Sequence, residues 1–496
     1  MHVHTRMSSG QYSLPELTQI ARTQEVDAIF LSDNLLTSIE FGLPPLRHIF
    51  YLRRRQAPSV LAFGAKRYLA EVQRENERQA DVLYIPGVEI IPRFFWSGAL
   101  LQTNLICHNH QRNLIVLGTY DPRTLAQLPL TSGYTPGRHS AWIIGTRLLL
   151  ALFIAAGLAT LILPRRLARQ SGYTAGQIRR AFLLGLILPL FLLMAAINTA
   201  ALMAPAFDIY SPDDPARFEQ RALTALSARG SLPELGQGSA SGGKSGKLLN
   251  FWAHPEAADH QEFRYLGVPF AVDTRPYPEV LLATKGWTGF AGVNEGENKF
   301  VDPGSVWDRV LQQHLAGQRD EPVWCFGERI YRAEGPGERL ANVETVVWAP
   351  EKKPAALLES IRRGFFYARH NWAGQALQLD LWQVAGCASG QTGQLTNGAV
   401  NISLRVSAKI PGEKAEVLII RNGIVIKKVT LTLPFELEIN DAPPPTARKA
   451  YYRAARLSRH RRDSSLTLGM TVSACHVERS RDISTSVVYF WLPPNN

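Results

Sequence analysis

The sequence predicts an α/β fold, either a parallel sheet or a barrel, which two membrane helices interrupt and a small antiparallel β domain follows. Three observations support this prediction. Short apolar runs alternate with helical patterns before residue 140 and again after residue 248, as in repeated βα units. Two long apolar runs lie between these regions. From about residue 400, apolar residues recur with a period of two, which indicates half-buried strands.

The chain of 496 residues is long enough for several folded units. We expect six segments in this order: residues 1–140, the first part of the α/β unit; 141–204, a transmembrane helical hairpin; 205–247, a linker or insertion; 248–395, the second part of the α/β unit; 396–457, an antiparallel β domain; and 458–496, a disordered or spurious tail.

Local patterns in the first α/β part predict its elements. Residues 26–32 and 82–91 have the apolar composition of buried strands, and residues 67–78 form a charged helical pattern between them. Ser13 and Glu16 have the spacing of a capping box, which predicts a helix directly after the first strand.

In the second part, residues 230–246 are rich in Gly and Ser and are expected to form a flexible linker. Residues 250–255 and 323–326 resemble strand ends, and residues 354–369 form an amphipathic helical pattern. Further on, Asn422-Gly423 lies within a period-two segment and predicts a two-residue type I′ hairpin turn.

Residues 142–163 and 181–203 are long and apolar enough to cross a bilayer as helices. The alternative is a pair of buried core helices. The loop between them has five arginines and no acidic residue, so the positive-inside rule places it in the cytoplasm. We therefore expect a multi-pass protein of a bacterial cell membrane with both soluble parts outside the cytoplasm. Because no export signal precedes the first part, Met1 is not expected to be the natural start.

The formal charge of +12 does not predict nucleic-acid binding. Many of the arginines belong to the hairpin loop or the tail, and no nucleic-acid module is recognisable. Residues 238–245 match a phosphate-loop pattern, but they lie in the Gly/Ser segment without a preceding strand, which indicates a chance match. The four cysteines lack the CxxC spacing of a zinc ribbon. No feature predicts an oligomeric state.

His2-Val3-His4 places two imidazoles on one face of an extended segment, where both can reach one metal ion. A single such pair is often incidental. Further motifs follow it in a defined order, and they are Asp33-Asn34, Gly87-Val88-Glu89, His108 and His254-Pro255-Glu256. This series resembles the motif series of the polymerase and histidinol phosphatase (PHP) family over residues 1–120 and 248–370.

The resemblance implies a distorted (β/α)7 barrel whose strand ends hold divalent zinc, manganese or iron, here one or two ions. By matching positions, the implied metal ligands are His2, His4, Glu89, His108 and His254. Asp33 matches the second motif and is assigned with Arg6 to the catalytic set. Arg6 and Arg93 lie near these motifs and could bind phosphate oxygens, although solvated arginines are the alternative. His110 is either a further ligand or an exposed histidine.

The chain also departs from the family pattern. Ser8-Ser9-Gly10 and Asn34 stand where the family has ligands, and Ile330 and Arg332 occupy its final Asp-x-His positions, with Glu328 the nearby carboxylate. The resulting hypothesis is a metal-dependent phosphoesterase that hydrolyses a small phosphoester outside the cytoplasm. The alternative is a catalytically inactive envelope protein that binds a glycan, a lipid head group or a protein partner.

Overall fold

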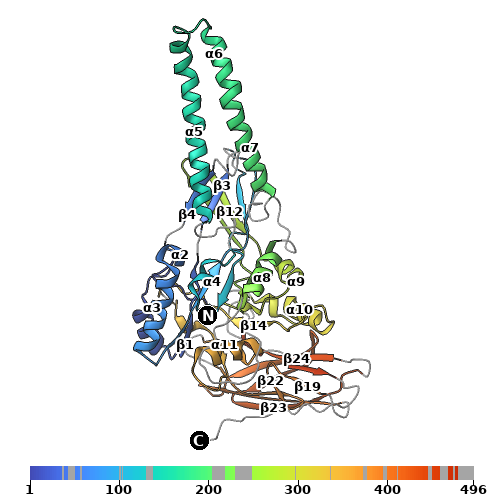
Figure 1. Ribbon diagram of the computed structural model, residues 1–496. Coiled ribbons are helices and arrows are strands. Elements are labelled where there is room, and N and C mark those ends of the chain that lie inside the picture. Colours follow the sequence, from blue (N-terminus) through green and yellow to red (C-terminus); the bar gives the residue numbers. More distant parts are fainter. Residues whose placement is uncertain are drawn as a thin grey trace, which may run out of the picture.

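The computed structural model describes most of the 496 residues. The described residues are 1–35, 38–42, 51–55, 58–99, 102, 104–129, 138–203, 218–229, 248–295, 298–335, 337–371, 377–394, 399–409, 411–444, 449–458, 467–472 and 475–478. They form three layers along one axis, with the helical hairpin at one end, a mixed α/β body in the middle and a β domain at the other end (Figure 1).

The strands of the central ring of the body come from both halves of the chain. They are β1 (Ala28–Phe30), β2 (Asp33–Asn34), β5 (Leu83–Ile85), β6 (Gly87–Ile90), β9 (Leu114–Leu117), β10 (Leu249–Trp252), β13 (Gly289–Val293) and β14 (Trp324–Gly327). The helices around them are α1 (Leu14–Thr23), α2 (Val60–Phe63), α3 (Ala65–Arg78), α4 (Pro122–Ala126), α8 (Phe218–Arg229), α9 (Pro278–Ala283), η4 (Lys299–Val301), α10 (Val306–Leu315), η5 (Leu340–Asn342) and α11 (Pro354–Arg363).

The strands of the body pair with one another so that they close into a ring. A six-stranded sheet has the order β14-β13-β10-β9-β6-β2. Val3 then bridges Leu31, which lies between β1 and β2, and also Tyr331, which follows β14. The two halves share one core, in which Val88 and Val116 from the first half and Phe251 from the second are fully buried.

The ring is mixed rather than all parallel, which corrects the expected uniform βα rhythm. β9 runs antiparallel to both β6 and β10. The chain between β6 and β9 forms the strands β7 (Phe95–Ser97) and β8 (Ile106–His108) and not a crossover helix. A parallel pair needs such a crossover, whereas an antiparallel pair does not.

A four-stranded sheet and a β hairpin lie between the ring and the base of the helices (Figure 1). The sheet has the order β11-β12-β8-β7, with β11 at Asp259–Tyr265 and β12 at Val268–Thr274. The hairpin pairs β3 (Ser38–Gly42) with β4 (Tyr51–Arg55). Phe41 of β3 packs edge-on against Trp96 of β7, and this contact joins the two units.

Several predicted elements are confirmed, and two are corrected. The backbone N–H of Ser13 donates to Glu16 at 2.7 Å, which completes the capping box of α1. The helix expected over residues 354–369 ends at Arg363, because Gly364 takes the left-handed conformation (φ 77°) and β16 follows. The expected linker at 205–247 contains helix α8, while residues 230–247, including 238–245, lie outside the described residues.

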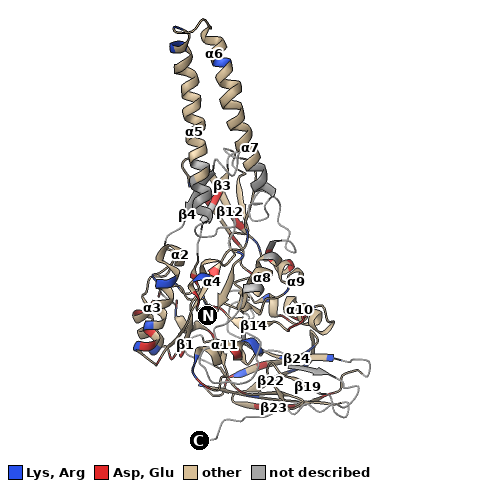
Figure 2. Ribbon diagram, in the orientation of Figure 1, with Lys and Arg blue, Asp and Glu red and all other residues tan. Residues whose placement is uncertain are grey.

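The helical hairpin consists of α5 (Arg138–Leu167), α6 (Ala175–Phe182), the π-helical turn η2 (Leu183–Ile187) and α7 (Leu188–Met203). Leu148–Leu167 and Ala175–Ile197 are long and apolar enough to cross a membrane, and only 17% and 6% of these windows are buried. Core helices would be mostly buried, so this alternative does not fit. The helices carry charge at their tip and almost none along their length (Figure 2).

The β domain comprises two sheets. The antiparallel sheet β18-β17-β20-β23 packs through its core with the sheet β15-β16-β25-β24-β21-β22, and β26 pairs with β19 and β24. Their strands are β15 (Val343–Val347), β16 (Phe366–His370), β17 (Leu377–Val384), β18 (Cys387–Ala388), β19 (Thr392–Gln394), β20 (Val400–Ala408), β21 (Lys414–Arg421), β22 (Ile424–Thr432), β23 (Phe435–Asp441), β24 (Lys449–Ser458), β25 (Thr467–Val472) and β26 (Cys475–Glu478).

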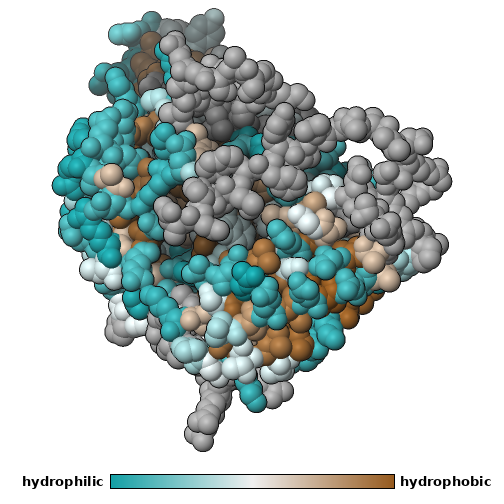
Figure 3. Space-filling view, turned by 90° about the horizontal axis from the view of Figure 1, so that it is seen from below, coloured by the Kyte–Doolittle hydropathy of each residue, from teal (hydrophilic) through white to brown (hydrophobic). Residues whose placement is uncertain are grey.

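Asn422 and Gly423 both have positive φ and connect β21 to β22, which confirms the predicted hairpin turn. Two expectations differ from the structure. Antiparallel pairing in the β domain begins with β15 and β16, well before residue 396, and β25 and β26 lie in the tail that was expected to be disordered. These tail strands add backbone hydrogen bonds to neighbouring strands that would otherwise present open edges. Figure 3 shows the face opposite the hairpin, where a hydrophobic area lies among hydrophilic residues.

A buried ion pair joins the β domain to the body. Arg453 of β24 and Asp308 of α10 are both fully buried, and the guanidinium donates to the two carboxylate oxygens at 2.8 and 2.7 Å. Tyr451 donates a third hydrogen bond to Asp308 at 3.0 Å. The Arg453 guanidinium also lies 5.0 Å from the centre of the Trp307 ring. This geometry compensates both charges and fixes the junction.

Replacing Arg453 by Met is expected to lower the free energy of unfolding by about 3–5 kcal/mol, because Asp308 would remain buried without its countercharge. Chemical denaturation of the detergent-solubilised protein measures this loss. Arg405→Met is the matched control and should change stability little, since Arg405 pairs with Glu436 at the surface, where solvent screens the attraction. Equal losses in both variants would contradict the assigned role.

Candidate metal centre

The candidate site lies where the ends of several ring strands meet. His2 and His4 flank Val3, whose bridges close the ring, and Glu89 belongs to β6. His254 follows β10, and Glu328 follows β14 directly. The first three residues come from the chain before the helical hairpin, and the last two come from the chain after it. The ring therefore brings together side chains that the helical hairpin separates in sequence.

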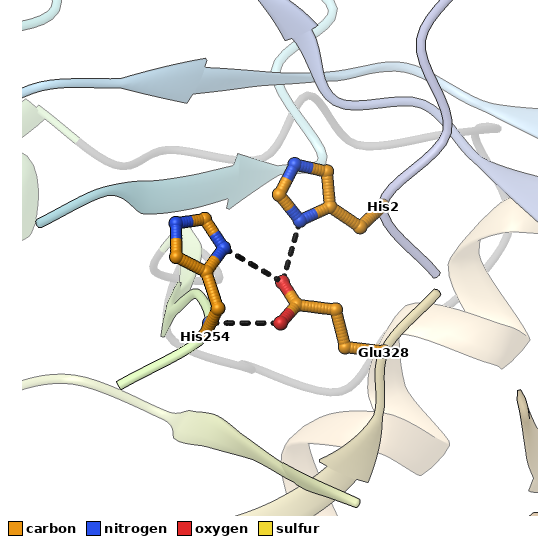
Figure 4. A group of neighbouring side chains, drawn as sticks. All are labelled: His2, His254 and Glu328. Carbon is orange, nitrogen blue, oxygen red and sulfur yellow. Dashed lines mark hydrogen bonds and ion pairs between the residues drawn. The ribbon is translucent and has the colours of Figure 1, made fainter. Parts of the chain in front are cut away.

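His2 lies between two carboxylates. Its Nδ1 is 2.5 Å from Oε1 of Glu328, and its Nε2 is 3.2 Å from Oε1 of Glu89. His254 approaches Glu328 from the other side, with its Nδ1 at 3.7 Å from Oε1 and its backbone N–H donating to Oε2 at 2.8 Å (Figure 4). The three residues His2, His254 and Glu328 form one group with the ligand spacing of a metal site.

A second group consists of His2, His4 and Glu89. The Nε2 of His4 is 3.8 Å from Oε2 of Glu89, and the rings of His2 and His4 are 5.0 Å apart. Both imidazoles thus face the same carboxylate, although His2 has a left-handed backbone (φ 76°) rather than the extended one that the sequence predicted. The two groups share His2, which makes it the centre of the whole arrangement.

Burial determines the electrostatics of the site. His2, His4, Glu89 and Glu328 are each at most 4% exposed. Burial alone would lower the pKa of His2, but the charges of Glu89 and Glu328 outweigh it and raise this pKa to about 9. For His4, burial dominates and lowers the pKa to about 3. Burial opposes ionisation of Glu328, yet the charge of His2 and its hydrogen bond lower the pKa of Glu328 to about 2.

The unsatisfied nitrogens fit a metal ion. Nε2 of His2, both ring nitrogens of His4 and Nδ1 of His254 are buried and have no hydrogen-bond partner. Leaving buried polar atoms unpaired is costly, and a cation placed among these nitrogens and the two carboxylates would satisfy them. Mixed imidazole and carboxylate ligands suit zinc, manganese or iron.

His110 and His108 lie in different surroundings. The Nε2 of His110 is buried without a hydrogen-bond partner, and burial lowers the pKa of His110 to about 4 against the opposing charge of Glu89. His108 lies in the separate sheet with β12, where its Nε2 contacts the Ser97 hydroxyl at 2.7 Å. Within the described residues, the two groups with metal-ligand spacing include neither His108 nor His110, so the structure does not bring His108 together with the other predicted ligands.

The two residues assigned to catalysis have other contacts. Asp33 accepts hydrogen bonds from the Thr5 backbone at 2.7 Å and from the Ser8 hydroxyl at 2.5 Å, and burial raises the pKa of Asp33 to about 6. It therefore holds the loop that follows His4. Arg6 is exposed, unlike its neighbours Thr5 and Met7, and pairs with Glu16 at 3.0 Å. The structure therefore gives Asp33 and Arg6 other contacts than those of the proposed ligands, and their catalytic roles stay predictions.

Sequence reasoning did not assign Glu328 and His110 to the ligand set. Glu328 lies directly after a predicted strand end, so the rule that ligands occupy the ends of barrel strands could have identified it. For His110, Asn109 has a left-handed backbone (φ 64°), which breaks the alternation of the strand. No sequence signal predicted this change of direction.

Comparisons with known proteins give only distant similarities. No family model and no curated protein matches the chain. A two-domain protein from Bacteroides vulgatus that contains a predicted PHP-like metal-dependent phosphoesterase is similar at 10% identity, over 95% of this chain and 92% of that chain, with a TM-score of 0.33. The CARDB domain of a Pyrococcus furiosus protein, in complex with two metal ions, covers 21% of this chain and 89% of its own at 14% identity, with a TM-score of 0.16. Scores this low do not establish a shared fold.

Without metal, the stability of the protein is expected to fall as the pH rises from 6.5 to about 9. The folded pKa of His2 is about 9 and its ordinary value is 6.5, so the stabilisation it gives is complete below 6.5 and is lost through this window. Thermal unfolding in the presence of a chelator measures this effect. His2→Gln should remove the decline, whereas His260→Gln, at an exposed histidine, should preserve it. An unchanged decline in His2→Gln would contradict the assignment.

Proposed function

We propose that this protein is a metal-dependent phosphoesterase of the PHP type, whose mixed ring is a distorted (β/α)7 barrel. His2, His4, Glu89, His254 and Glu328 would hold one or two divalent ions, with His110 as a further ligand. A bound ion of this kind activates water and stabilises charge on a phosphoester oxygen. The proposed substrate is a small phosphoester.

One observation carries this proposal. Histidines and carboxylates from both halves of the chain converge at strand ends. Four buried imidazole nitrogens of His2, His4 and His254 have no hydrogen-bond partner there, and three of them lie 3.2–3.8 Å from an oxygen of Glu89 or Glu328. A purely structural cluster would be expected to satisfy these atoms internally. The order of these residues in the sequence agrees with the motif series of the family.

The residues of the proposed site make different contributions to metal binding. Glu89 and Glu328 supply negative charge on opposite sides of His2. The main-chain carbonyl of Gln111 accepts a hydrogen bond from Nε2 of His254 at 3.1 Å, so Nδ1 of His254 is left to act as a ligand. His254 is the least buried of the ligands, with 12% of its side chain exposed, and it marks the side from which water and substrate would enter.

We further propose that the helical hairpin crosses a bacterial cell membrane with its arginine-rich tip in the cytoplasm. This topology places both soluble parts outside the cytoplasm. The hairpin has apolar, exposed helices and charged residues at its tip, which supports this arrangement. Nucleic acid is not a proposed partner.

A catalytically inactive envelope protein is the second candidate function. The near-complete burial of His2, His4 and Glu328 favours it, because substrate must reach the ion in an enzyme. Asn34 also contacts Ser9 at a position where the family has a ligand. Such a protein would use the metal to stabilise the ring and would bind a glycan, a lipid head group or a protein partner through another surface.

The double variant His2→Ala, His4→Ala is expected to lose bound metal and hydrolysis of a generic aryl phosphate. Elemental analysis and a chromogenic phosphatase assay on the full-length protein in detergent measure both losses. His108→Ala is the control and should retain its metal, because His108 lies in another sheet. Metal binding without hydrolysis in the wild type would favour the second candidate, and absence of metal in the wild type would overturn the site.

A further inference from the structure

The segment 109–113 contacts two of the proposed ligands. The carbonyl of Gln111 accepts from His254, and the Asn113 side chain donates to Oε1 of Glu89 at 2.6 Å. The backbone of Asn113 also accepts from the N–H of Ala253 at 2.9 Å, directly before His254. The position of segment 109–113 therefore sets the orientation of Glu89 from the first half of the chain and of His254 from the second. Arg112 lies between these two contact residues.

The Arg112 side chain contacts residues of α8 and α9 and the ring of Tyr277. It is about nine-tenths buried, with 8% of the side chain exposed. Its Nη1 is 3.6 Å from Oε1 of Glu219 on α8, and its Nη2 donates to Glu279 on α9 at 3.1 Å. The guanidinium lies 5.4 Å from the centre of the Tyr277 ring, and the hydroxyl of Tyr277 donates to the carbonyl of Ala253.

Glu219 provides the connection to α8. It is fully buried near the start of this helix, while Leu223 and Leu226 of α8 belong to the core of the body. α8 is the first described element after the helical hairpin. Charges buried in this way are stabilised only when the partner is held in place, so Glu219 and Arg112 fix each other.

We propose that Arg112 is a positioning residue of the metal centre and that Glu219 holds it in place, so that tight metal binding requires α8 to be docked on the body. The proposal rests on the proposed metal site. Arg112 acts through its neighbours, because Gln111 fixes the ring of His254 and Asn113 fixes the carboxylate of Glu89. Residues that orient ligands in this way commonly change metal affinity by about 10–100-fold.

A purely structural role for Arg112 predicts a different result. In that case, removal of the side chain would lower stability but leave the affinity of the folded protein for metal unchanged. Arg319 offers a matched comparison, because it is also buried, lies 5.1 Å from the centre of an aromatic ring, Trp287, and donates to main-chain carbonyls. Its contacts lie on α9 and α10 rather than on segment 109–113.

The experiment measures the affinity of the full-length protein in detergent for Co²⁺ by competition with a chelator, and the visible absorption of the bound Co²⁺ reports the ligand geometry. Arg112→Met and Glu219→Gln are expected to weaken binding by about 10–100-fold and to alter the spectrum. Arg112→Lys, which keeps the charge, should restore part of the affinity. Arg319→Met should lose stability and keep the affinity and spectrum of the wild type.

The outcomes separate this inference from the proposed function. If the wild type binds no Co²⁺, the metal site itself fails. If the wild type binds Co²⁺ and folded Arg112→Met binds it equally well with the same spectrum, the positioning role is overturned. Equal losses of affinity in Arg112→Met and Arg319→Met would also overturn it, because the effect would then follow from general destabilisation.

Discussion

The arrangement of Glu89 and Glu328 around His2 is the constraint on which the site depends. Two carboxylates buried in the same region repel each other unless a positive charge lies between them. In the metal-free protein, His2 supplies that charge, which explains the raised pKa of its imidazole. A metal ion would replace the proton and use the same geometry. Glu89 comes from the first half of the chain and Glu328 from the second. His2 can contact both carboxylates only when the ring brings the two halves together.

The sequence predicted the parts of the site that lie in short motifs. His2 and His4 face one carboxylate, as the His-x-His motif predicted, although the backbone of His2 is left-handed (φ 76°) and not extended. Glu89 and His254 were found by their order in the motif series. The capping box at Ser13 and the turn at Asn422 were also predictable, because local chemistry alone determines both features.

The remaining features depend on contacts that no local pattern contains. The left-handed backbone of Asn109 separates His108 at the end of β8 from His110, which is buried and whose pKa responds to the charge of Glu89. The antiparallel direction of β9 follows from the sheet that precedes it in the chain. The strands β25 and β26 pair with β24 nearby in the chain and also with β16 and β19, which lie far away in sequence, so their own weak periodicity could not indicate them. Glu328 was predictable in part, since the strand before it was predicted but its contact with His2 was not.

The pairing of Leu117 with Leu249 has a consequence for biosynthesis. The chain leaves the ring at β9, forms the entire helical hairpin and returns as β10 at the adjacent position. A ribosome therefore completes β9 long before its neighbour β10 exists, and the nascent protein carries an open sheet edge while the hairpin is being synthesised. Such an edge attracts other strands. Protection of β9 during this interval therefore favours a productive yield.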